Sequence, residues 1–494
     1  MLNQSLSWAA RCYREKLLND PFRPIYHFTL PDSDGRPGDP NGFFFAQGRY
    51  HLMYLYRHAD QTFHWGHVSS LDLLHWRHHP DALSALPGDA GCFSGGAFVD
   101  EDNTAWLSYW IFNDEDMTNQ GVGLACSKPP YDQWERLPHA VIPSDQWGII
   151  IDESGMALGC ADPSNIWKKK GIYYMQTGNK AVLDAFGREQ NAPEHYRGDW
   201  TELFKSDDLK HWKYCGRFYQ RKVDDSWTKS SEDNMCPSFL PLPNLPEDGN
   251  LTDSMLQLFI SHNMGCQYYT GKLEGERFIP EQHGRMSWVD DTFFAPEASL
   301  DAHNRHIMFA WLRDDLPNQF ELSDWCGVYS LPRQLWIDQH DKLCMKPISE
   351  LTRLRVQKFP CSTDQKKIHV PTPLSFELQV TANPKENFCI HVLCRENGNR
   401  VVIGYDVQKA LLYVDATSSG TSQRSVRECA PLELLPQEKL ELTCYVDHSV
   451  VEVFANQRQA ITRRIYNQAT VLPYIEVNGA DLLDIWEMGS CMPY

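Results

Sequence analysis

Acidic side chains occur beside or shortly before a proline at three distant points of the sequence. They are Asp39 in Gly38-Asp39-Pro40-Asn41-Gly42, Asp162 in Ala161-Asp162-Pro163-Ser164-Asn165, and Glu232-Asp233 ahead of Met235-Cys236-Pro237. Proline fixes its own φ angle and pushes the preceding residue toward an extended conformation, so these turns are stiff. Each one alone has an ordinary explanation as a turn. In a chain with the strand pattern described next, three such sites are explained more economically by a glycosidase, which uses paired carboxyl groups.

The segments around these acids have the pattern of β-strands joined by turns. Short apolar or aromatic runs alternate with turns rich in Asp, Asn, Gly and Pro, and helical periodicity is confined to the N-terminal end. A strand, a Ser/Asp turn and a Trp recur over 69–76 and 206–212, and more loosely over 127–134. Repeated units of this kind indicate a β-propeller, whose central funnel can collect acids from distant blades.

The pattern changes near residue 345. Strands with clean alternation follow, for example over 374–380 and 449–454. Alternation with one wet face is typical of a β-sandwich. We therefore predict an all-β chain with a helical extension over 1–25, a propeller catalytic domain over 26–345, a linker over 346–365 and a β-sandwich over 366–494.

The amino-acid composition limits the classes of molecule that the protein can bind. The net charge is −19 without a basic block, which argues against nucleic acid and anionic membranes. No run of about 20 apolar residues is long enough to cross a bilayer. The 16 Trp and 21 Tyr suit stacking on sugar rings, so we expect a small-molecule or oligosaccharide substrate.

Two further features bear on the compartment and on cofactors. The first 21 residues lack the apolar core of a signal peptide, and the 15 Cys are scattered without C-x-x-C pairs. We therefore predict free thiols in a cytoplasmic protein. No zinc spacing occurs, His75–His79 has the character of a surface strand end, and we expect neither a metal nor an organic cofactor. The sandwich offers a contact surface for a homo-oligomer.

Short motifs in a fixed order give the chain a resemblance to glycoside hydrolase family 32, the β-fructofuranosidases. The motifs are Asp39-Pro40-Asn41-Gly42, Trp65-Gly66-His67, Asp72-Leu73-Leu74-His75-Trp76, Phe93-Ser94-Gly95-Gly96-Ala97, Ala161-Asp162-Pro163, Met235-Cys236-Pro237, Phe294-Ala295-Pro296-Glu297, Leu331-Pro332-Arg333 and Val450-Val451-Glu452-Val453-Phe454. Their order extends over most of the chain. The resemblance implies a five-bladed β-propeller followed by a C-terminal β-sandwich.

The resemblance also implies retaining hydrolysis of a β-fructofuranoside bond, with two carboxyl groups about 5–5.5 Å apart. Asp39 would be the nucleophile, and Asp162 would hold two hydroxyls of the bound sugar. The same subsite would be lined by Asn41, Trp65, Phe93 and Ser94. Hydrolysis and fructosyl transfer share one intermediate, so the sequence does not separate them.

One departure from the family pattern concerns the proton donor. Met235 stands where the family has its acid/base Glu, and a thioether transfers no proton. Three explanations compete. The acid has moved to Glu232 or Asp233, the protein is a catalytically dead carbohydrate binder, or the substrate has a leaving group that needs no protonation. Strand alternation puts Asp233 on the face of Met235, whereas Glu232 has the longer reach and the higher reference pKa. We predict Glu232 as the acid, with Asp233 as the alternative.

Other departures concern the substrate. Leu55 and Ala161 replace polar family residues, while Arg57 is gained. These changes point to an unusual fructoside, such as a phosphorylated or cyclic disaccharide, as an alternative to sucrose or fructo-oligosaccharides. Two other functions stay open: a carbohydrate-binding protein on a decayed propeller, and a propeller glycosidase for a pentose. Retention of both Asp39 and Asp162 argues against the binder, and Val450–Phe454 against the pentose enzyme.

Overall fold

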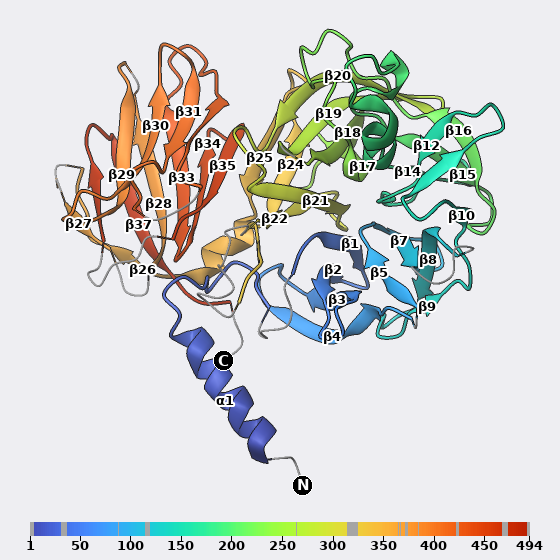
Figure 1. Cartoon of the computed structure of the whole chain (residues 1–494). Coiled ribbons are helices and arrows are strands. Elements are labelled where there is room, and N and C mark those ends of the chain that lie inside the picture. The colour runs from blue at the N-terminus through green and yellow to red at the C-terminus, as the bar shows by residue number, and fades with distance from the viewer. Residues whose placement is uncertain are drawn as a thin grey trace. The chain divides into compact units, whose positions relative to one another are not determined.

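The computed structural model describes residues 4–30, 37–86, 88–113, 119–262, 264–313, 325–363, 365, 367–370, 374–383, 385–420, 424–466 and 473–491. The chain is all-β apart from one N-terminal helix and a few short helical segments, which confirms the predicted class (Figure 1). The helical elements are α1 (Gln4–Leu18), α2 (Lys180–Val182), η1 (Leu183–Gly187), η2 (Glu194–Tyr196) and η3 (Ser349–Leu354). Among the described residues, no helix is long and apolar enough to span a membrane.

The chain forms two compact units. One contains Pro37–Trp311 and Pro332–Cys344, and the other contains Met1–Arg36, Leu312–Leu331 and Met345–Tyr494. The domain boundaries given above stay predictions.

The first unit begins with a sheet in the order β1-β2-β3-β5-β7-β8-β10, with β4, β6 and β9 paired beside it. These strands are β1 (Pro40–Ala46), β2 (Arg49–Arg57), β3 (Phe63–Ser70), β4 (Trp76–Leu83), β5 (Asp89–Phe93), β6 (Ala97–Val99), β7 (Ala105–Asn113), β8 (Gly121–Ser127), β9 (Glu135–Arg136) and β10 (Ile142–Pro143). Trp65, Leu107 and Tyr109 are fully buried in its core.

Sheets built from consecutive strands follow in the same unit. They are β11 (Ile149–Ile151) with β12 (Ala157–Gly159); β13 (Trp167–Lys169), β14 (Ile172–Thr177), β15 (Glu202–Ser206) and β16 (Lys213–Arg217); β17 (Met235–Pro243), β18 (Leu251–Ser261), β19 (Gly265–Glu274) and β20 (Arg277–Arg285); and β21 (Phe293–Leu300), β22 (His306–Leu312), β24 (Arg333–Ile337) and β25 (Leu343–Pro347). Within the sheet β13–β16 and within the sheet β17–β20, each strand pairs with its neighbours in sequence, as hairpins do.

The second unit holds two six-stranded antiparallel sheets and the short β23 (Val328–Tyr329). One sheet contains β26 (Arg355–Phe359), β37 (Leu482–Met488), β28 (Ser375–Ala382), β33 (Leu440–Asp447), β34 (Val450–Ala455) and β35 (Gln459–Arg464), in that order. The other contains β27 (Ile368–His369), β36 (Tyr474–Val477), β29 (Phe388–Cys394), β30 (Val401–Asp406), β31 (Leu411–Asp415) and β32 (Arg427–Pro431).

A buried polar network ties the N-terminal segment of this unit to its sheet. The carboxylate of Asp447 accepts the backbone N–H groups of Ile25, Tyr26 and His27, each at 2.9 Å, and His27 Nδ1–H at 2.8 Å. Nε2 of the same ring lies 3.2 Å from Glu452. Burial alone would raise the pKa of Asp447, but the hydrogen bonds from His27 and His448 lower it. The carboxylate therefore stays charged inside the core.

We expect Asp447→Ala to remove about 3–5 kcal/mol from the free energy of unfolding, because it strands a buried imidazole and three buried N–H groups. Asp415→Ala is the matched control. Asp415 also ends a strand and accepts from a backbone N–H, that of Thr417, but on an exposed turn, so its loss should stay below about 1 kcal/mol. Urea unfolding of both variants measures the difference, and equal losses would contradict the role of the network.

Candidate active site

A cavity of about 710 Å³ in the first unit contains four of the predicted site residues: Asp39, Asp162, Phe93 and Ser94. Trp110 and Trp147 add further aromatic surface. The remaining polar lining comes from Lys180, Asp184 and His262, and Met235 also faces the cavity. The pocket therefore combines acidic groups with aromatic rings, the composition expected for binding a sugar.

Asp39 is fixed by the turn that leads into β1. Its carbonyl accepts the N–H of Leu55 at 2.9 Å, and Gly38 N–H donates back to Leu55 at 2.7 Å. Gly42 has φ +52°, and a Cβ there would lie 2.8 Å from the Leu107 side chain. Only glycine fits this conformation and this contact. The turn is therefore rigid on the side that presents the carboxylate.

The two predicted aspartates meet at a single thiol. Cys236 Sγ lies 3.6 Å from Asp39 Oδ2 and 3.4 Å from Asp162 Oδ2, and Ser94 Oγ–H donates to Asp39 Oδ2 at 2.5 Å. Burial, and after it the charge of Asp39, raises the pKa of Asp162 to about 6. Burial and the two carboxylates also raise the pKa of Cys236 well above its usual value, so the thiol keeps the proton that it donates.

Left-handed backbone conformations accompany this meeting point. Asp162, Cys236 and Ala295, each the residue before a proline, have φ of 44°, 48° and 44°. Such conformations cost about 1–3 kcal/mol for residues other than glycine, and they gather at functional sites. The pairing of β17 with β18 shifts register between Met235 and Ser238, which is a β-bulge. A bulge re-aims the neighbouring side chains, here toward the pocket.

Glu232 does not line this pocket. Its carboxylate receives Arg285 Nη2 at 2.9 and 3.0 Å, Gln267 Nε2 at 2.9 Å and the Lys229 N–H at 3.0 Å. Burial alone would raise the pKa of Glu232, but the contacts with Arg285 lower it. A proton donor needs the opposite shift, so these contacts do not favour the predicted acid role.

Asp233 reaches the pocket only through His262. Its carboxylate lies 2.8 Å from His262 Nδ1 and accepts the His262 N–H at 3.2 Å. The Asp233 side chain is 3% exposed and that of His262 is 37% exposed. Asp233 therefore orients the imidazole of His262, and this imidazole is the group that faces the pocket.

Three predicted contact residues lie outside the pocket lining. Asn41 is buried and accepts the Gly95 N–H at 3.2 Å, behind the residues that face the cavity. Trp65 is fully buried in the core of its sheet. Arg57 is exposed at the end of β2, where it donates to the Gln61 carbonyl and lies over the Phe63 ring. Their roles in substrate binding stay predictions.

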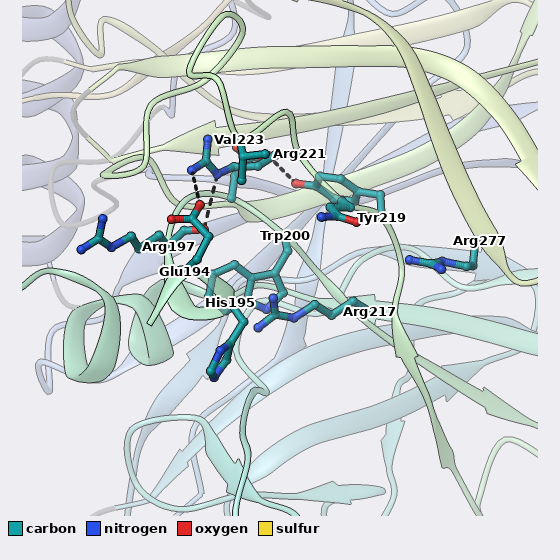
Figure 2. Close-up of a pocket in the computed structure, with 11 residues that line it drawn as sticks. Glu194, His195, Arg197, Trp200, Arg217, Tyr219, Arg221, Val223 and Arg277 are labelled. Carbon is teal, nitrogen blue, oxygen red and sulfur yellow. Dashed lines mark hydrogen bonds and ion pairs between the residues drawn. The ribbon is translucent and has the colours of Figure 1, made fainter. Parts of the chain in front are cut away.

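A second cavity, of about 480 Å³, lies in the same unit and is strongly basic (Figure 2). Arg197, Arg217, Arg221 and Arg277 line it. Glu194 is bound by the Arg221 guanidinium at 3.3 Å. The other acid, Asp199, accepts the hydroxyls of Tyr219 and Tyr269 at 2.7 and 2.9 Å. Because both carboxyl groups are engaged, this cavity lacks the pair that glycoside cleavage needs.

Metal-ligand atoms come together at two places among the described residues, both outside the acidic pocket. His58, Asp60 and His64 do so beside the β2–β3 turn, and His391, Cys394 and Glu476 do so in the second unit, within 4.8 Å in each case. Retaining glycosidases of the two-carboxyl type use no metal, so neither group enters the chemistry considered below.

Comparison with known proteins identifies the family. The model of the glycosyl hydrolases family 32 N-terminal domain matches residues 30–347, and that of the family's C-terminal domain matches residues 349–486. The chain belongs to glycosyl hydrolase family 32. The resemblance inferred from its motifs is thereby confirmed.

Relatives in family 32 match along nearly the whole chain. Levanase of Bacillus subtilis (strain 168) is 26% identical, covering 93% of this chain and 68% of the relative. Raffinose invertase of Escherichia coli is 27% identical, covering 90% of each. Fructan 1-exohydrolase IIa of Cichorium intybus superposes with a TM-score of 0.77 at 20% identity, covering 95% of this chain and 98% of the other. Sucrose-6-phosphate hydrolase of Lactobacillus gasseri gives the same TM-score and identity, covering 98% and 97%.

Sequence reasoning missed several residues that line the pocket of this family 32 protein. Trp110 belongs to β7 and His262 follows β18, and neither carries a turn motif that marks it. Lys180 pairs with Asp184 across α2 and η1, a short helical segment that the strand pattern did not suggest. Strand alternation could have placed Trp110, whereas His262 needed the register of two strands.

The pKa of Asp162 gives a test by pH. Its folded-state pKa of about 6 lies above the ordinary pKa of an aspartate, so charging Asp162 destabilises the fold as the pH rises through 6. We expect the stability of Asp162→Asn relative to wild type to increase by about 2 kcal/mol from pH 4 to pH 8. Urea unfolding at both pH values measures the change.

Asp184→Asn is the control of opposite sign. Burial alone would raise the pKa of Asp184, but Lys180 and Arg188 lower it. This variant should therefore lose stability relative to wild type as the pH rises. An Asp162→Asn difference that stays flat between pH 4 and pH 8 would show that Asp162 is not desolvated as described.

Proposed function

We propose that the protein is a retaining β-fructofuranosidase that releases fructose from the end of a fructoside. The observation that carries the proposal is the meeting of Asp39 and Asp162 at one thiol in a pocket lined by tryptophans. Family membership supports the reaction class. The names of the relatives, a levanase, an invertase and sucrose-6-phosphate hydrolases, support a fructosyl substrate.

In this proposal Asp39 attacks the anomeric carbon of the fructosyl unit. Ser94 donates to one of its oxygens and so holds the other toward the sugar. Asp162 accepts from sugar hydroxyls, and these hydrogen bonds strengthen as positive charge develops on the ring. Phe93 and Trp110 pack against each other and give the sugar an apolar wall.

The proposed scaffold is a five-bladed β-propeller that holds the pocket, followed by a β-sandwich. The consecutive four-stranded sheets β13–β16 and β17–β20 have the form of blades, and the paired six-stranded sheets have the form of a sandwich. Predicted domain limits at 26–345 and 366–494 belong to this proposal. A cytoplasmic location and a homo-oligomer stay predictions.

The lining also bears on which fructoside is cleaved. Leu55 and Ala161, the apolar replacements noted in the sequence, both face the cavity. They remove hydrogen-bonding capacity from the subsite and favour a substrate with fewer polar groups at those points, such as an unusually linked fructoside.

Met235 is the observation that favours a second function, a carbohydrate-binding protein. It lines the pocket at the position of the family acid and carries no proton. The two functions differ in turnover. Purified protein offered sucrose, levan, inulin and 1-kestose should release fructose, measured by chromatography. Binding by calorimetry without any release from these substrates would establish the binder instead.

Asp39→Asn should lower the rate of fructose release by about 10⁴-fold or more, because an amide is a poor nucleophile. Asp152→Asn is the control. Asp152 closes an exposed turn through Ser154 and Met156, so activity should stay within twofold of wild type. Full activity in Asp39→Asn would remove Asp39 from the nucleophile role.

A further inference from the structure

Within the proposed hydrolysis, the proton donor is the missing part. Met235 carries no proton, and the Glu232 carboxylate is held by Arg285 away from the pocket. We propose that His262, oriented by Asp233, is the general acid and base of this site. The inference rests on the proposed function and adds a catalytic imidazole to it.

The position of His262 follows from the register of two strands. Met235 opens β17 and pairs with Ile260 near the end of β18. Directly paired residues share a face of the sheet, and so do residues two apart on one strand. β18 ends at Ser261, and His262 follows it directly; its backbone N–H donates to the Asp233 carboxylate at 3.2 Å, which holds it beside the start of β17. Both side chains line the cavity that holds Asp39 and Asp162.

Asp233 decides which nitrogen of the ring faces the sugar. Its carboxylate accepts only, so Nδ1 of His262, at 2.8 Å, is the protonated donor. Nε2 is then the nitrogen that gains and loses a proton, and the structure gives it no hydrogen-bond partner among the described residues. The same logic, a carboxylate behind an imidazole, fixes the tautomer and stabilises the imidazolium in other enzymes.

The surroundings of the pair keep Asp233 in place. Ser261 Oγ–H donates to the Asp233 carbonyl at 2.7 Å, and Arg188 Nη2 lies 4.0 Å from the carboxylate. The imidazole and the Phe294 ring make a T-shaped contact with 5.9 Å between their centroids. The charged groups on the pocket side are Asp39, Asp162, Lys180 and Asp184.

The chemical steps balance with these groups alone. Asp39 attacks C2 of the fructosyl unit while the bond from C2 to the leaving oxygen breaks. Nε2–H of the imidazolium gives its proton to that oxygen, and the alcohol departs. Neutral His262 then takes a proton from water as the water oxygen bonds to C2. The ester bond to Asp39 breaks, and the carboxylate and the imidazolium are restored.

The test compares a poor and a good leaving group. With sucrose or 1-kestose, His262→Asn should lower kcat/KM by about 10²–10⁴-fold, the usual contribution of general acid catalysis. With 4-nitrophenyl β-fructofuranoside, which needs no protonation, kcat/KM should fall less than tenfold. The kcat for this aryl fructoside should fall further, because hydrolysis of the fructosyl-enzyme then lacks its general base. Azide, which needs no base to attack the fructosyl-enzyme, should restore kcat.

The pH profile gives a second readout. In wild type, kcat/KM for sucrose should fall at high pH as the imidazolium loses its proton, and this limb should vanish in His262→Asn. Asp162→Asn should keep the limb. Asp233→Asn should move the high-pH decrease to lower pH, because the imidazolium loses its carboxylate partner. This variant retains His262 and so provides a test even if His262→Asn folds poorly.

His211→Asn is the matched control. Its Nδ1 pairs with the Asp208 carboxylate at 2.6 Å, as in the proposed pair, but on an exposed turn away from the pocket. Its kinetics should equal those of wild type. Equal losses on both substrates in His262→Asn, or an unchanged high-pH limb, would overturn the assignment while leaving fructose release itself intact. Absence of turnover in wild type would instead overturn the proposed function.

Discussion

The site depends on one electrostatic constraint, the close approach of two carboxyl groups, of which that of Asp162 is buried, to one thiol. Burial, and after it the charge of Asp39, raises the pKa of Asp162 to about 6. Burial and the two carboxylates raise the pKa of Cys236, so the thiol keeps its proton between them. Holding such groups together requires rigid backbone around each. The turn at Gly42 and the strained residues before Pro163 and Pro237 supply that rigidity. The free energy for this strain comes from the large cores of the surrounding sheets.

The prolines were the part of this site that the sequence could predict. A stiff turn beside an acid is visible in sequence, and it located Asp39 and Asp162 in what proved to be a common pocket. The left-handed conformation of Asp162 and Cys236, before Pro163 and Pro237, could not be predicted, because an X-Pro sequence favours extended backbone. Glu232 shows the opposite limit. Arg285 and Gln267, which engage its carboxylate, lie 53 and 35 residues away and were not linked to it by any local pattern.

The fold class followed directly from strand and turn patterns, whereas His262 depended on pairing. A histidine after an apolar strand could not be assigned a role until the structure showed its hydrogen bonds to Asp233. An imidazole in place of a third carboxyl group also changes the charge of the pocket. As a proton donor an imidazolium is a cation before the transfer and neutral after it, whereas a carboxylic acid is neutral before and an anion after.

The hydrogen bonds of Asp447 have a consequence for how this protein can be divided. Its partners are Ile25, Tyr26 and His27, so the C-terminal unit includes a strip from the opposite end of the chain. The backbone passes between the two units four times. A single recombination point in the gene therefore cannot add or remove the whole C-terminal unit. Shuffling of such proteins would have to exchange both ends of the gene together.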